Sequence, residues 1–96
     1  MSKTIDLTLI GKSGCHLCDE ARVTVNAVVG AFRAENTGVA RHVQVNLVEH
    51  DILVDEELYN QYSEEVPVLL INGKIHNYWR IDPVRLRGAL DELISK

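Results

Sequence analysis

Two cysteines, Cys15 and Cys18, are the residues whose type and spacing most clearly predict chemistry. They are the only cysteines of the chain, and they stand three positions apart between an apolar run and a helical pattern. Residues at this spacing share one face of a helix, so the two sulfur atoms can reach each other and close a small disulfide. The unpaired N–H groups of a helix N-terminus favour the thiolate, which is the attacking form of the sulfur. The pair therefore predicts thiol–disulfide exchange, with Cys15 as nucleophile and Cys18 as the residue that resolves the mixed disulfide.

Other interpretations of this stretch stay open. The cysteines could be unreactive, partly buried thiols. A structural zinc site needs four ligands, and the chain offers two cysteines and scattered histidines, so we expect no metal. Lys12 is a cation that can favour a thiolate at Cys15 or contact an anionic thiol substrate, and His16 can stabilise the thiolate when protonated, although each can equally be a solvated side chain.

Length and composition set the class of protein. With 96 residues the chain is predicted to form one domain over residues 1–96. The formal net charge of −4 argues against a nucleic acid or an anionic membrane as partner. The N-terminus lacks the apolar segment of a signal peptide, and the longest apolar runs are too short to span a bilayer. We therefore expect a cytoplasmic monomer. In that reducing compartment, a cysteine pair is expected to be catalytic rather than to form a structural disulfide.

The elements that must position the cysteines are predicted in the order strand, helix, strand, helix, strand, strand, helix. A right-handed crossover makes the first two strands parallel. The Asn72-Gly73 dipeptide predicts a type I′ hairpin between the last two. These rules predict an α/β fold, with a mixed four-stranded sheet and helices on both of its faces. The expected strands cover residues 4–10, 43–48, 67–71 and 74–79, and the expected helices cover residues 15–35, 55–62 and 82–94.

Helix ends and buried stripes follow from the same patterns. Asp55 and Asp82 are predicted N-caps, the second with Pro83 in the favoured first position, and Gly38 is available to end the first helix. Apolar residues at helical spacing predict the faces turned to the core. In the first helix these are Leu17, Ala21, Val25, Val28 and Phe32, and in the last helix they are Val84, Leu86, Leu90, Leu93 and Ile94.

At this point nearly the whole chain resembles the thioredoxin superfamily, most closely its glutaredoxin-like branch and a group of small bacterial glutaredoxin-like proteins. Residues 12–18 (KSGCHLC) are similar to the glutaredoxin run Lys-x-x-Cys-Pro-Tyr-Cys, and Val66-Pro67 is similar to the Val-Pro step before the third strand. The resemblance implies a thioredoxin-like three-layer sandwich and a cis Val66–Pro67 bond that faces the cysteines. It also implies a dithiol–disulfide oxidoreductase that reduces protein or small-molecule disulfides, with Lys12, His16, Val66 and Pro67 as substrate-binding residues.

The sequence also departs from the glutaredoxin pattern. Glu65 stands where glutaredoxins carry threonine, and residues 77–82 (NYWRID) replace the Gly-Gly-x-x-Asp segment that holds glutathione. These changes argue against a standard glutathione site. Two electron donors stay open, glutathione as a co-substrate and a flavoprotein of the thioredoxin-reductase type. No bound cofactor is expected. The alternative function is a thioredoxin-fold module for protein binding or redox sensing without turnover.

Overall fold

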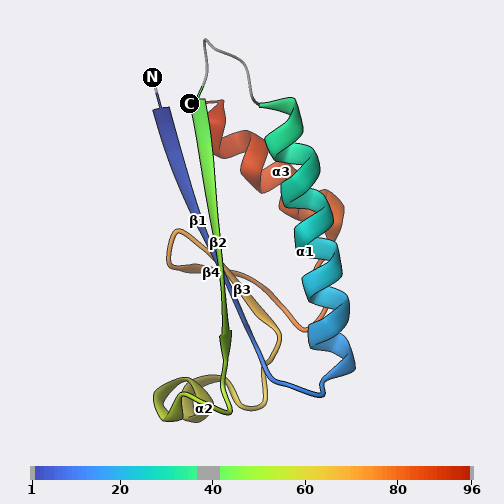
Figure 1. Ribbon diagram of the computed structural model, residues 1–96, viewed down its shortest axis with the longest axis vertical. Coiled ribbons are helices and arrows are strands. Elements are labelled where there is room, and N and C mark those ends of the chain that lie inside the picture. The colour runs from blue at the N-terminus through green and yellow to red at the C-terminus, as the bar shows by residue number, and fades with distance from the viewer. Residues whose placement is uncertain (1, 37–41, 96) are drawn as a thin grey trace.

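The computed structural model describes residues 2–36 and 42–95, which form a four-stranded sheet and three helices in the predicted order (Figure 1). The glycine terminus predicted at Gly38 lies outside the described residues. None of the helices within those two ranges has the length and apolar character that crossing a bilayer requires. The elements are β1 Ser2–Gly11, α1 His16–Glu35, β2 His42–Asp51, α2 Glu56–Tyr62, β3 Val68–Ile71, β4 Lys74–Tyr78 and α3 Pro83–Ile94.

The sheet has the strand order β2-β1-β3-β4 and mixes both kinds of pairing. β1 and β2 are parallel along their full length, as the crossover through α1 requires, while β3 is antiparallel to both β1 and β4. The turn between β3 and β4 places Asn72 at φ 51° and Gly73 at φ 82°. Positive φ at both positions is what a type I′ hairpin needs, and it explains the Asn-Gly pair.

The main core lies between the sheet and two helices. Figure 1 shows α1 and α3 side by side on one face of the sheet. Alternate residues of β1, Ile5, Leu7 and Leu9, point to this face and pack with Phe32 of α1 and Leu90 of α3. All five side chains are buried.

The third layer is small and covers one end of the sheet. Ile10 of β1 and Val68 of β3 point to the face opposite Leu9 and Leu69, and they pack with Tyr62 of α2. In Figure 1, α2 lies at the end of the sheet where β1 leads into α1. The helices therefore lie on both faces as predicted, and both faces are covered at the end that carries the cysteines.

Several predicted details are wrong. β1 and β2 extend to ten residues each, because parallel pairing continues past the apolar alternation that marked the strands. In α1, Val29 is fully buried although the predicted stripe did not include it, while Val28 packs against the same core and is partly buried. Val84 is 80% exposed, because it lies two residues before Leu86 and so about 200° away around α3, on the side turned from the core. β4 ends at Tyr78 instead of residue 79.

Candidate functional site

Cys15 occupies the N-cap position of α1. Its backbone is extended, at φ −101° and ψ 120°, and its carbonyl accepts the N–H of Asp19 as the helix begins. Its sulfur accepts the backbone N–H of Cys18 at 3.2 Å. Gly14, at φ 80°, turns the chain just before this cap. A half-buried sulfur thus sits at the positive end of a 20-residue helix, where N–H groups and the helix dipole stabilise a thiolate.

Cys18 lies one turn inside α1, behind Cys15. Its side chain is 2% exposed. Burial, as the largest cause, and the hydrogen bond with Cys15 together raise the pKa of the Cys18 thiol to about 11, against a smaller lowering by the backbone N–H of Lys12. A Cβ added at Gly11 would lie 3.2 Å from both Cβ and Sγ of Cys18, so this glycine makes room for the second sulfur. Both cysteines are free thiols.

The Val66–Pro67 segment completes the environment of the two sulfur atoms. Its peptide bond is cis. Val66 is 8% exposed and belongs to the same apolar cluster as Cys15 and Cys18. The carbonyl of Pro67 accepts the N–H of Trp79 at 2.7 Å, which ties this segment to the end of β4. The fold thus brings a segment 50 residues away in sequence against the cysteine pair.

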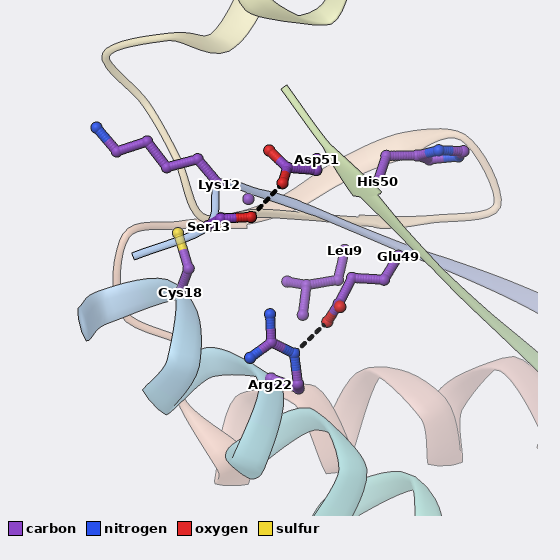
Figure 2. Close-up of a pocket in the computed structure, with 9 residues that line it drawn as sticks. Leu9, Lys12, Ser13, Cys18, Arg22, Glu49, His50 and Asp51 are labelled. Carbon is purple, nitrogen blue, oxygen red and sulfur yellow. Dashed lines mark hydrogen bonds and ion pairs between the residues drawn. The ribbon is translucent and has the colours of Figure 1, made fainter. Parts of the chain in front are cut away.

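A cavity of about 160 Å³ adjoins Cys18 (Figure 2). Its walls come from the β1–α1 loop, α1 and the end of β2. Two polar bridges cross it: Ser13 Oγ donates to Asp51 Oδ2, and Arg22 Nε donates to Glu49 Oε1 at 2.7 Å. The lining residues are Leu9, Gly11, Lys12, Ser13, Cys18, Arg22, Glu49, His50 and Asp51.

A second, more apolar groove of about 530 Å³ lies between α1 and the β4–α3 loop. Leu17, between the two cysteines, lines it together with Trp79 of the β4–α3 loop. Trp79 is 53% exposed and adopts φ 58°, a strained conformation for a bulky residue. Its Nε1 donates to the carbonyl of Glu64 at 3.4 Å. An exposed tryptophan therefore flanks the helical turn that carries the two cysteines.

The structure treats the predicted substrate-binding residues differently. Val66 and Pro67 are both buried, and Val66 belongs to the apolar cluster that includes Cys15 and Cys18. Lys12 is exposed, and Figure 2 shows its side chain directed away from Cys18, so only its backbone engages the pair. His16 is exposed at the first position of α1. Within residues 2–36 and 42–95, no three His, Cys, Asp or Glu side chains come together as a metal site would require.

Sequence reasoning missed the polar residues of β2 at this site. Val43, Val45 and Leu47 alternate toward α1, and the same period of two places Glu49 and Asp51 on that face. The alternation that marks the apolar residues of this strand continues into its polar end. Extending a strand's core-facing register until its pairing ends would have identified both carboxylates.

Comparison with known proteins gives a family match and a set of similar folds. The family model described as Glutaredoxin-like domain (DUF836) matches residues 6–91. The X-ray structure of the Northeast Structural Genomics target protein XcR50 from X. campestris is similar at 29% identity, with a TM-score of 0.63 over 90% of this chain and 96% of that one. No curated protein sequence matches.

Two thioredoxins share the fold at low identity. Chloroplastic thioredoxin z is 12% identical, with a TM-score of 0.72 over 97% of this chain and 80% of that one. Mitochondrial thioredoxin 3 from Saccharomyces cerevisiae is also 12% identical, with a TM-score of 0.60 over 92% of this chain and 77% of that one. The predicted thioredoxin-like fold is thereby confirmed.

Proposed function

The chain belongs to the glutaredoxin-like domain family, and from this premise we propose that it is a dithiol–disulfide oxidoreductase that reduces disulfides through Cys15 and Cys18. One observation carries the proposal. Cys15 is half-exposed at the N-terminus of α1 and its sulfur accepts a backbone N–H at 3.2 Å, while Cys18 lies buried one turn behind it. An accessible sulfur with thiolate stabilisation and a shielded partner within reach are the two parts that exchange requires.

The reaction is a two-electron transfer. The Cys15 thiolate attacks one sulfur of a substrate disulfide, forms a mixed disulfide and expels the first substrate thiolate. Cys18 loses its proton and attacks Cys15, which closes the Cys15–Cys18 disulfide and expels the second substrate thiolate. The substrate disulfide has then been reduced to two thiols, and the protein dithiol has been oxidised. A thiol or flavoprotein donor must return two electrons before the next turnover.

The surroundings of Cys15 favour a peptide or protein disulfide over glutathione. The Val66–Pro67 segment lies beside the cysteines, where its backbone can pair with an extended chain. In residues 77–82, the segment that replaces the glutathione-binding glycines of glutaredoxins, Trp79 occupies the place of a glycine. The carboxylate of Asp82 caps α3 by accepting the N–H groups of Val84 and Arg85. We therefore propose that glutathione is a poor co-substrate and that a flavoprotein reductase supplies the electrons. A reducing compartment such as the cytoplasm suits this chemistry.

A comparison of electron donors tests the proposed function. Reduction of a model disulfide is followed through NADPH oxidation, once with glutathione and its reductase and once with thioredoxin reductase. We expect turnover with the second donor, weak turnover with the first, and loss of both in Cys15→Ser. The matched Cys18→Ser variant keeps the nucleophile and should form mixed disulfides without releasing them. A protein that turns over with neither donor would instead fit the binding or sensing module.

A further inference from the structure

Cys18 needs a proton acceptor before it can attack the mixed disulfide. The thiolate is the nucleophile in disulfide exchange, and the thiol does not replace it. The Cys18 side chain is 2% exposed, and its burial raises the thiol pKa to about 11, so the sulfur is protonated at neutral pH. This step belongs to the proposed function, and so the inference below rests on that function.

The cavity beside Cys18 offers a route for this proton. Its volume of about 160 Å³ has room for water, and its polar walls provide hydrogen-bond partners for it. Figure 2 shows Cys18 on one wall, with its sulfur directed toward Ser13, and the ion-paired side chains of Arg22 and Glu49 on another. The Glu49 side chain is 44% exposed, so it borders both the cavity and bulk solvent. β1, the strand that leads into the motif, contributes only Leu9 and Gly11 to the lining, and neither can accept a proton.

We propose that Glu49, oriented by Arg22, accepts the proton of Cys18 through water in this cavity when the mixed disulfide is resolved. The Cys18 thiol gives its proton to the water chain, and the chain delivers a proton to the Glu49 carboxylate. The resulting Cys18 thiolate attacks the sulfur of Cys15, the Cys15–Cys18 bond forms, and the bond to the substrate sulfur breaks with release of a substrate thiolate. Glu49 then returns the proton to solvent. Protons and electrons balance without a further reactant.

The other carboxylate in the cavity is less suited to this role. Asp51 accepts hydrogen bonds from the Ser13 hydroxyl and the Leu53 N–H, and these bonds hold the pKa of its carboxyl below the ordinary value. It therefore stays ionised and holds the β1–α1 loop in place through its hydrogen bond with Ser13. Glu49 Oε1 accepts a hydrogen bond from Arg22 Nε at 2.7 Å, and this ion pair orients the carboxylate. The other oxygen, Oε2, is then the atom that can receive a proton.

The charges around Cys18 determine how a substitution must be interpreted. Figure 2 shows the side chains of Lys12 and His50 pointing away from the sulfur. The titratable and charged groups packed around Cys18 are Lys12 of the β1–α1 loop, Cys15, Asp19 and Arg22 of the α1 segment, Glu49 and Asp51 of β2, and Tyr62 of α2. Removal of a carboxylate from this set makes the Cys18 thiolate easier to form on electrostatic grounds alone. Electrostatics and proton transfer therefore predict opposite signs for Glu49→Gln.

Single-turnover kinetics with a chromogenic disulfide separate the two steps. Reduced protein is mixed with one equivalent of the symmetrical nitrobenzoate disulfide, whose released thiolate absorbs visible light. The first phase reports attack by Cys15, and the second reports attack by Cys18. In Glu49→Gln we expect a normal first phase and a second phase slowed by about tenfold to a hundredfold near neutral pH, which is the scale of general-base catalysis. The second phase should then rise in proportion to hydroxide concentration, whereas in the unsubstituted protein it should level off.

Two further variants keep the test specific. Glu49→Asp retains a carboxylate and should recover much of the second-phase rate. Asp19→Asn removes the other carboxylate that pairs with Arg22, at 2.8 Å, and should leave the second phase unchanged or slightly faster. Glu49 is exposed enough that none of these changes empties the core. A normal first phase with an unchanged or faster second phase in Glu49→Gln would overturn this inference alone. A missing first phase in the unsubstituted protein would overturn the proposed function and this inference with it.

Discussion

Cys15 and Cys18 are chemically alike in sequence and differ in the fold. Cys15 is half-exposed at the helix start, whereas Cys18 is 2% exposed with a pKa near 11. We predict that iodoacetamide at pH 7 alkylates Cys15 at least about tenfold faster than Cys18, because the thiolate fraction falls tenfold for each unit of pKa. Peptide mass spectrometry after short labelling measures the order. Faster labelling of Cys18 would reverse the assigned roles.

Gly11 is a second residue whose environment sets its identity. Because an added Cβ would lie 3.2 Å from two atoms of Cys18, we predict that Gly11→Ala costs about 1–3 kcal/mol of unfolding free energy through overpacking. The matched control is Gly88→Ala in α3, where nothing lies within 4 Å of the added Cβ and the helix should gain up to about 1 kcal/mol. Urea unfolding of both variants measures the two changes in unfolding free energy. Equal effects in the two variants would show that the close approach to Cys18 carries no cost.

At the residue scale, the sequence identified the cysteines but not their polar neighbours. Motif spacing is local, so the Cys15–Cys18 relation is fixed by one helical turn. The nearness of Glu49 and Arg22 depends on how α1 crosses β2, which no local pattern specifies. The exposure of His16 and Lys12 likewise depends on loop geometry, so their charge could be read from the sequence while their direction could not.

At the scale of elements, caps and turns were the predictable features. Asp55 and Asp82 cap α2 and α3 as expected, and the Asn72-Gly73 hairpin has the predicted positive φ angles. These signals depend on one or two residues and the next turn of backbone. The ends of β1, β2 and β4 were predicted less well, since pairing partners and the strained Trp79 set them. Val84 lies nearly opposite Leu86 around α3, so its exposure agrees with the helical period and the prediction that it faces the core is wrong.

The cap of α3 allows a test at this scale. We predict that Asp82→Ala lowers the unfolding free energy by about 1 kcal/mol, because Val84 and Arg85 lose their N–H acceptor. It should leave any weak glutathione-coupled activity unchanged. Asp55→Ala, which removes the cap of α2, is the matched control for stability. Robust glutathione turnover that collapses in a stably folded Asp82→Ala protein would mean that Asp82 binds glutathione.

At the scale of the whole molecule, helices cover both faces of the sheet at the end that carries the two cysteines. α1 and α3 cover one face along its length, while α2 closes the other face beside the cysteines and Val66. The order of elements and the sense of each strand followed from connectivity rules, so the sequence predicted the architecture well. The third layer was predicted, but the end of the sheet that it covers was not, because the seven-residue length of α2 does not say where that helix lies.

His76 of β4 links the stability of the sheet and α3 to pH. Its Nε2 is buried without a hydrogen-bond partner in the described structure, and burial together with Arg85 of α3 holds its pKa below the ordinary 6.5. The unfolded chain therefore binds a proton below about pH 6.5 that the folded chain resists. We predict that stability falls as pH drops through this window, by at most about 1.4 kcal/mol per pH unit from this residue. Urea unfolding of His76→Gln should show a shallower acid slope, and an identical slope would contradict the assignment.

The most direct test of the central claim is intact-mass analysis of Cys18→Ser after it reacts with a peptide disulfide. The account predicts a single covalent adduct, one peptide thiol in mass, that maps to Cys15, is released by a reducing agent and is absent from the Cys15→Ser, Cys18→Ser double variant. The absence of an adduct on Cys15 under conditions where the protein is folded would contradict the claim that Cys15 is the attacking nucleophile of a dithiol–disulfide oxidoreductase.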